Sequence, residues 1–240
     1  MTNDEWKDIV TYYDELYVKP EQYQTEVQQV LSFCQNYQQS DGKRLLDVAC
    51  GTGGHITYLQ DHFQVSGVDL SESMLAVARK KFPDVPFYQG NMTDFSLDRQ
   101  FDVIIYLYGS IGFVRTNEKL KLTLKNMVRH LLPGGIAIIV PWSTTESFQE
   151  KIVVDAVKHP HMRIARMENV KRKAIDCVEV TFHHLIGQNG EVKYHTQRME
   201  IGLFSHNEYV SAIEEAGLQL VEIYDGPNIR MGAFVGRLTR

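Results

Sequence analysis

An acidic residue precedes a cluster of glycines in the run LDVACGTGG, which spans residues 46–54. At the carboxyl end of a buried strand, glycines let the backbone approach a ligand closely, and the N-terminus of the following helix favours an anionic group. A second acid, Asp69, ends an apolar run 22 residues after Asp47. A carboxylate at that place can accept both hydroxyls of an adenosine ribose. We therefore expect an adenosine-containing cofactor here, with Asp69 on its ribose and Asp47 beside the glycine turn.

Three classes of ligand fit a glycine turn of this kind to different degrees. A P-loop requires a lysine after its last glycine, and that lysine is missing. The dinucleotide pattern is met only from Ala49, with alanine in the position of the tight-turn glycine. S-adenosylmethionine is the third class. The turn and Asp69 together leave NAD and S-adenosylmethionine both open.

Later landmarks separate these two cofactors. The segments QGNMTD at 89–94, FDVI at 101–104 and LLPGG at 131–135 follow or precede the next strands. Together with the glycine turn they resemble a class I S-adenosylmethionine-dependent methyltransferase, over about residues 40–142. The resemblance implies that S-adenosylmethionine is the cofactor and that the adenine lies near Asn91 and Met92.

A second resemblance spans most of the chain. It is carried by YDELY at 13–17, ACGTG at 49–53, GSIGF at 109–113, PW at 141–142 and GAFVG at 232–236. These segments look like those of the N,N-dimethyltransferases of nucleotide-linked amino sugars, which methylate the 3- or 4-amino group of a deoxyhexose. The resemblance implies a small-molecule acceptor, reached from beyond the fourth strand.

The two resemblances imply a set of site residues. Cofactor contacts are expected from Tyr17, Asp47, Ala49, Cys50, Gly51, Gly53, Asp69, Leu70, Met74, Asn91, Met92 and Tyr106. Catalytic roles are expected for Tyr13, Tyr106, Tyr108 and His184, with Ser110 near the acceptor and His55 near the cofactor.

The chemistry of the acceptor favours nitrogen over oxygen. An amine attacks in its neutral form, and a nearby His or Tyr can accept its proton, whereas an alcohol needs a stronger base or a metal. The sequence contains no metal-binding motif. We expect in-line methyl transfer to an amine. A small-molecule O-methyltransferase, an NAD-dependent oxidoreductase and a non-catalytic module with the same fold are the alternatives.

The pattern of short apolar runs and amphipathic segments predicts the elements that position these residues. Strands are expected at 45–49, 65–70, 85–89, 101–107, 136–140, 218–224 and 231–237, with helices capped by Ser71, Asn117 and Ser205. Alternating strands and helices indicate an α/β fold with a doubly wound, mainly parallel seven-stranded sheet of the Rossmann-like type. This methyltransferase domain comprises residues 41–142 and 205–240, after a helical segment at 1–40.

The rhythm changes between residues 143 and 204. Two long strands, 174–185 and 192–204, flank a hairpin signal at 187–190 and predict an antiparallel insertion. Because strand side chains alternate, His183 and His184 point to opposite faces, as do Arg198 and Met199. The insertion is expected to serve as a platform for the acceptor or for a homodimer contact.

Composition excludes several other functions. The 240 residues are 43% hydrophobic and 23% charged, with a formal net charge of -5 and a pI of about 6.0. Nucleic-acid binders usually carry a basic excess, so no nucleic-acid partner is expected. The basic run at 158–173 is interpreted as a solvated face. The sequence has no apolar run of about 18 residues and no signal peptide, and its three cysteines are far apart. We therefore expect a cytoplasmic protein that does not associate with membranes.

Overall fold

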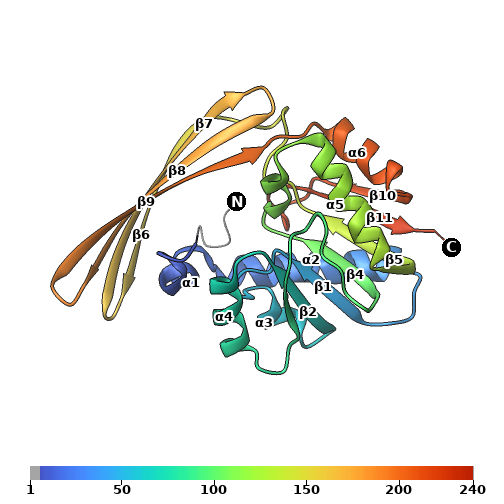
Figure 1. The fold of residues 1–240 in the computed structure, drawn as a ribbon, viewed down its shortest axis with the longest axis horizontal. Helices are drawn as coiled ribbons and strands as arrows, with labels where there is room; N and C mark the ends of the chain where they lie inside the picture. The colour runs from blue at the N-terminus through green and yellow to red at the C-terminus, as the bar shows by residue number, and fades with distance from the viewer. Residues whose placement is uncertain (1–5, 240) are drawn as a thin grey trace.

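The computed structural model describes residues 6–239, and its strands form two sheets (Figure 1). Residues 1–5 of the predicted helical segment and residue 240 of the predicted methyltransferase domain lie outside the described residues. The first sheet has seven strands in the order β10-β11-β5-β4-β1-β2-β3. Its strands are β1 Arg44–Val48, β2 Gln64–Asp69, β3 Phe87–Gln89, β4 Phe101–Tyr106, β5 Leu131–Ile139, β10 Leu218–Tyr224 and β11 Ala233–Leu238.

Most neighbours in this sheet are parallel. The β1–β2, β1–β4, β2–β3 and β4–β5 pairs run parallel, and β11 runs antiparallel to both β5 and β10. The predicted doubly wound, mainly parallel seven-stranded sheet is confirmed. Parallel strands ending at one edge bring the segments that follow β1, β2 and β4 together there.

Helices cover both faces of the seven-stranded sheet. A 3-10 helix at Val10–Tyr12 precedes the α-helices, which are α1 Tyr13–Tyr17, α2 Pro20–Tyr37, α3 Ile56–Leu59, α4 Glu72–Lys81, α5 Asn117–Arg129 and α6 His206–Glu215; a second 3-10 helix is Ser110–Val114. Apolar side chains of α5 and α6 pack on one face, and those of α2, α3 and α4 on the other. The core strands are therefore covered on both sides, as their nearly continuous apolar runs require.

Some predicted boundaries are confirmed and others shift for local reasons. Ser71 accepts from the Met74 N–H, and Ser205 with Glu208 forms a capping box. Thr116, and not Asn117, caps α5 by accepting from the Lys119 N–H. Strand β3 begins at Phe87 because Pro86 has no N–H to donate to a ladder.

The insertion forms the second sheet, with four antiparallel strands in the order β6-β7-β8-β9. These are β6 Lys151–His159, β7 Met162–Ala174, β8 Cys177–Gln188 and β9 Glu191–Gly202. The predicted hairpin at 187–190 is confirmed: Asn189 and Gly190 have positive φ values of 54° and 81°. The prediction missed β6 and β7, and it placed a strand start at residue 174, where β7 ends.

A third apolar core joins the two sheets. The N-terminal residues Ile9, Leu16 and Tyr17 pack with the inner face of the four-stranded sheet, where Val180 and Phe182 are buried. Figure 1 shows α1 between that sheet and the parallel sheet. The short N-terminal segment thus contributes to both halves of the molecule.

Candidate cofactor and acceptor site

A cleft of about 1620 Å³ opens between the strand ends of the seven-stranded sheet, α1 and the inner face of the four-stranded sheet. Pockets for a single small molecule are usually about 300–1,000 Å³. Asp69 lies in this cleft, and so does Met199 from the antiparallel sheet. The cleft is therefore large enough for a cofactor and a second molecule together.

The glycine turn presents bare backbone to the cleft. Gly51 has φ +54°, and no atom lies within 4 Å of the place where a β-carbon would be. The Gly51 N–H donates to Asp69 Oδ2 at 2.8 Å, and the Ser71 N–H donates to Asp69 Oδ1 at 2.8 Å. Burial raises the pKa of Asp69, and these backbone donors oppose the rise. An oriented carboxylate beside open backbone fits an adenosine-type group whose ribose hydroxyls donate to Asp69.

Most of the predicted cofactor residues come together around this turn. Those that line the cleft are Tyr17, Ala49, Gly51, Asp69, Leu70, Met74, Asn91 and Met92. The Thr93 N–H donates to Asn91 Oδ1 at 3.1 Å and orders the segment after β3. These residues would hold the cofactor.

Three other predicted cofactor residues do not line the cleft. Asp47 is buried beside His55, and burial raises its pKa to about 7. The Cys50 sulfur packs between strands, 2.7 Å from where a β-carbon of Gly67 would lie. A β-carbon at Gly53 would meet Phe82 on α4. Asp47 and Cys50 therefore lie beneath the turn, and Gly53 leaves room there for the Phe82 ring.

The predicted place of Tyr106 is wrong. Its side chain is fully buried in the core between the sheet and α5, and it does not line the cleft. Residues alternate along β4, so Tyr106 shares the face of Ile104, which is also in this core. The side chains that reach the cleft come from the residues that follow, Leu107 and Tyr108.

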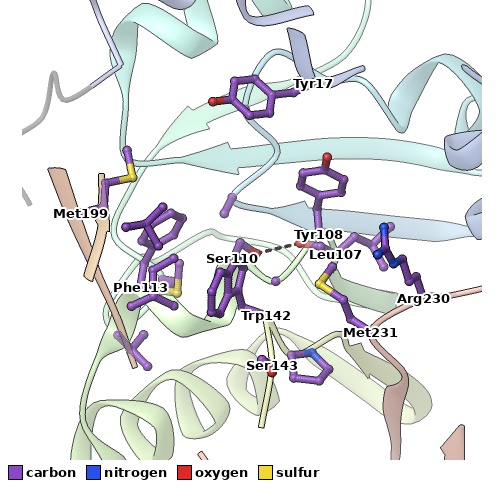
Figure 2. Close-up of a pocket in the computed structure, with 18 of the residues that line it drawn as sticks. Tyr17, Leu107, Tyr108, Ser110, Phe113, Trp142, Ser143, Met199, Arg230 and Met231 are labelled. Atoms are coloured by element: carbon purple, nitrogen blue, oxygen red, sulfur yellow. Dashed lines mark hydrogen bonds between the residues drawn. The ribbon is translucent and has the colours of Figure 1, made fainter. Parts of the chain in front are cut away.

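Tyr13, Tyr108 and Ser110, which were predicted near the reacting groups, all line the cleft. The Ser110 hydroxyl donates to the Leu107 carbonyl at 3.1 Å, the dashed line in Figure 2. Burial raises the pKa of Tyr13 and of Tyr108, so both remain protonated hydroxyls near neutral pH. They can orient an amine by hydrogen bonding.

Mostly apolar side chains line the rest of the cleft. Figure 2 shows Met199 and Phe113 on one side of the view and Arg230 with Met231 on the other. Met199 is 4% exposed, and its neighbour Arg198 points outward, as the alternation of β9 predicts. The inner face of the antiparallel sheet is therefore one wall of the cleft.

The sequence reasoning missed a charged group on this wall. Arg166 is 8% exposed, pairs with Asp155, and lies 2.8 Å from Glu168. Its guanidinium carbon is 4.6 Å from the centroid of the Tyr17 ring. Arg166 belongs to the basic run interpreted as a solvated face, and its buried position follows only once β7 is recognised as a strand. Trp6, in the same aromatic cluster as Tyr17, was also missed.

His184 is buried beneath the cleft and does not line it, contrary to its predicted catalytic position. It is 0% exposed, and its Nε2 lies 3.4 Å from the Tyr17 hydroxyl. Burial and the charge of Arg166 lower its pKa to about 4, so the ring is neutral near pH 7. The other predicted histidine, His55, pairs with Glu26 at 2.7 Å and stacks on Tyr23 beneath the turn.

Two further observations bear on the class of protein. Within residues 6–239, no group of three or more His, Cys, Asp or Glu side chains is arranged to hold a metal ion. In the same range, each helix is too short or too polar to cross a membrane. A mainly parallel seven-stranded sheet, with a glycine turn after β1 held to an acid at the end of β2, is the arrangement of the class I S-adenosylmethionine-dependent methyltransferases.

Comparisons with known proteins place the chain within that class. A family model for a methyltransferase domain matches residues 45–135. The dTDP-3-amino-3,4,6-trideoxy-alpha-D-glucopyranose N,N-dimethyltransferase of Streptomyces venezuelae is 35% identical over 82% of this chain and 83% of its own length. The dTDP-4-amino-2,3,4,6-tetradeoxy-D-glucose N,N-dimethyltransferase of Saccharopolyspora spinosa is 34% identical over 82% of this chain and 79% of its own.

Solved structures agree with the sequence relatives. The crystal structure of Streptomyces venezuelae DesVI has a TM-score of 0.84 and 32% identity, covering 90% of this chain and 91% of that one. CalS10, an amino pentose methyltransferase from Micromonospora echinaspora solved with S-adenosylmethionine, has a TM-score of 0.81 and 28% identity, with coverage of 90% and 92%. The chain belongs to the S-adenosylmethionine-dependent methyltransferase family that contains these amino-sugar enzymes. The predicted family, cofactor and enzyme class are confirmed.

Proposed function

We propose that this enzyme N-methylates the amino group of a nucleotide-linked deoxy-amino sugar. The observation that carries the proposal is the large single cleft, in which a wall from the antiparallel sheet lies across from the predicted cofactor residues. The relatives named above act on 3-amino and 4-amino sugars attached to dTDP. An acceptor of that size and polarity suits the part of the cleft beyond Tyr108.

The mechanism relies on alignment. S-adenosylmethionine, when bound, supplies an activated methyl group. Holding the acceptor in line with it can contribute about 7–11 kcal/mol toward the barrier. The Gly51 backbone and Asp69 would hold the adenosine end, and the hydroxyls of Tyr13 and Tyr108 would accept the N–H groups of the neutral amine so that its lone pair faces the methyl group. The N–C bond would form as the S–CH3 bond breaks, which leaves S-adenosylhomocysteine and a protonated amine whose proton passes to water. We propose these two tyrosines as the catalytic residues.

Basic side chains supply a place for the diphosphate. Arg115, Lys119 and Arg230 all line the cleft. Arg115 lies 3.3 Å from Glu200. Arg230 is exposed and makes no ion pair within the described part of the chain, so we assign it the acceptor diphosphate. Arginine suits this role because its planar group forms paired hydrogen bonds with phosphate oxygens.

The proposal is tested with the purified chain, S-adenosylmethionine and a panel of acceptors. The panel contains dTDP-linked 3-amino and 4-amino deoxyhexoses, the matching hydroxy sugars, simple amines and hydroxy-aromatics. We expect mass spectrometry to show one and then two added methyl groups on an amino sugar. Methylation of hydroxy-aromatics or hydroxy sugars, without methylation of an amino sugar, would replace the proposal with O-methylation.

The proposal extends to the subcellular localisation and the oligomeric state of the enzyme. We propose a cytoplasmic enzyme without a nucleic-acid partner, which its net charge of -5 and its three free thiols support. Sedimentation of the purified protein distinguishes a monomer from the homodimer considered for the antiparallel sheet.

A further inference from the structure

A row of polar side chains crosses the inner face of the antiparallel sheet. Asp155 on β6 pairs in register with Arg166 on β7, Arg166 with His184 on β8, and His184 with His195 on β9. The neighbouring inner-face positions on β8 are Phe182 and Ile186, both buried. A polar row within an apolar face is costly unless its groups find partners.

Tyr17 on α1 lies against this row. The Arg166 guanidinium carbon is 4.6 Å from the Tyr17 ring centroid. The Tyr17 hydroxyl is 3.4 Å from His184 Nε2. His184 Nδ1 is buried without a hydrogen-bond partner among the described residues. The contact with Tyr17 is therefore the polar contact that orients the His184 ring.

The chemistry of a neutral phenol and a neutral imidazole favours one direction for this hydrogen bond. A phenol O–H is a better donor than an imidazole N–H, and an imidazole nitrogen is a better acceptor than a phenol oxygen. We therefore assign the Tyr17 hydroxyl as the donor and His184 Nε2 as the acceptor. A neutral imidazole whose Nε2 accepts carries its proton on Nδ1.

We propose that His184 is a positioning residue, which accepts the Tyr17 hydroxyl at Nε2 and thereby holds the Tyr17 ring as a wall of the cleft. Tyr17 lines the cleft and His184 does not. The hydrogen bond thus fixes the position of Tyr17, which is assigned to the cofactor, relative to the antiparallel sheet, which is assigned to the acceptor. This role differs from that of a general base, since burial and Arg166 both oppose a positive charge on His184.

The first test observes the hydrogen bond without turnover. In the full-length protein with 15N-labelled histidines, we expect the His184 resonances to report Nδ1–H and an unprotonated Nε2. Tyr17→Phe should shift the Nε2 resonance, while His183→Gln should leave it in place. His183 is the matched control because it lies on the opposite face, where its Nδ1 contacts the Tyr194 hydroxyl at 2.6 Å. A proton on Nε2, or a resonance unmoved in Tyr17→Phe, would overturn the proposal.

The second test is kinetic and rests on the proposed function for its acceptor. Loss of one hydrogen bond that aligns the site should lower kcat about tenfold in His184→Leu, with the KM for S-adenosylmethionine changed less than about threefold. His184→Gln, which keeps an acceptor oxygen, should restore most of kcat, and His183→Gln should match the wild type. Tyr17→Phe with His184→Leu should be no slower than the slower single variant.

The outcomes separate positioning from general structural support and from a wrong acceptor. Equal loss in the Leu and Gln variants, with a lowered Tm in both, would overturn positioning in favour of support of the fold. Additive losses in the double variant would overturn the pairing. If the wild type methylates no amino sugar, the proposed function fails, while the tautomer measurement still decides the role of His184.

Discussion

Unusual backbone conformations are concentrated at the cleft. Four non-glycine residues in the described part of the chain have positive φ, and three of them, Ala49, Tyr108 and Arg115, line the cleft. Residues with a β-carbon seldom adopt this region, and it persists where surrounding structure enforces it. Ala49 follows β1 and Tyr108 follows β4, so both stand where the strands deliver the chain to the cleft.

Removal of the Asp69 carboxylate tests the cofactor end. We expect Asp69→Ala to weaken binding of S-adenosylhomocysteine about ten- to hundredfold, because an ionised hydrogen-bond acceptor is worth about 1.5–3 kcal/mol. Isothermal titration measures the dissociation constant, and exposed Asp61→Ala serves as control. An unchanged dissociation constant in folded Asp69→Ala would remove Asp69 from the site.

A side chain at Gly51 should block the cofactor while the fold survives. In Gly51→Val the new side chain points into open space in the cleft, where the ligand must lie. Gly190→Val is a matched control, since Gly190 also has positive φ and open space around its β-carbon position but lies in the β8–β9 turn. Titration should show no binding for Gly51→Val and normal binding for Gly190→Val; equal affinities would contradict the assignment.

Asp47 should make stability depend on pH. Burial raises its pKa in the folded state from 3.8 to about 7, so the folded protein retains a proton that the unfolded chain releases. Its contribution therefore favours folding below about pH 4 and is lost as the pH rises to about 7. As the pH rises across this range, urea unfolding should show the free energy of unfolding of Asp47→Asn increasing relative to that of the wild type, by roughly 4 kcal/mol at most. A constant difference between the two proteins from pH 4 to pH 8 would contradict this.

At the scale of elements, the strands with a simple hydrophobic pattern were the ones that the sequence predicted. The parallel strands could be predicted because burial on both faces leaves runs such as LLDV and FDVII nearly free of polar residues. Strand β7 could not be predicted, because its inner face carries Arg166 and Glu168. These charged residues interrupt the alternation of apolar and polar residues that indicates a strand, so the segment looks like a basic stretch. Those same residues are the part of the site that sequence reasoning missed. The prediction for Tyr106 was wrong because Tyr106, the last residue of β4, faces the core, whereas Leu107 and Tyr108, which follow it, line the cleft.

The alternation of β9 gives an element-scale test of the acceptor wall. Met199→Trp adds bulk to the inner face and should raise the KM of the acceptor about tenfold or more, while S-adenosylhomocysteine affinity stays the same. Arg198→Trp places the same side chain on the exposed outer face and should leave both quantities near wild type. Steady-state kinetics with varied acceptor measures the difference. An unaffected KM in Met199→Trp would place the acceptor elsewhere.

The whole molecule has two halves, the seven-stranded sheet with its helices and the four-stranded sheet, and a short N-terminal segment packs between them. We propose that the first is the cofactor half and the second the acceptor half. Apart from Tyr17 on that segment, the cleft-lining residues assigned to the cofactor lie between residues 49 and 92, and the antiparallel wall lies between residues 151 and 202. The N-terminal segment also contacts the cofactor half, since Asp14 accepts from Thr52 in the glycine turn and from Lys81 at 2.7 Å. Substitutions in this segment can therefore affect both halves.

Deletion of residues 150–200 tests this division. We expect the shortened protein to retain S-adenosylhomocysteine binding through Asp69 and Gly51, and to lose methyl transfer because the acceptor wall is gone. Removal of the inner face also exposes Leu16 and Tyr17, so a lower Tm is expected. Titration, mass spectrometry and thermal unfolding measure the three effects. A soluble deletion variant that still methylates the acceptor would refute the role of the wall.

The contact between α1 and the antiparallel sheet bears on the exchange of acceptor preference between relatives. A chimaera that exchanges only residues 151–202 would separate the Arg166 and His184 positions from the Tyr17 that they contact in this chain. We therefore propose that acceptor preference is exchanged as two segments that are distant in sequence, the sheet at 151–202 and the helix at 13–17. Recombination libraries built with crossovers that keep these two segments from one parent should yield more active enzymes than libraries that separate them.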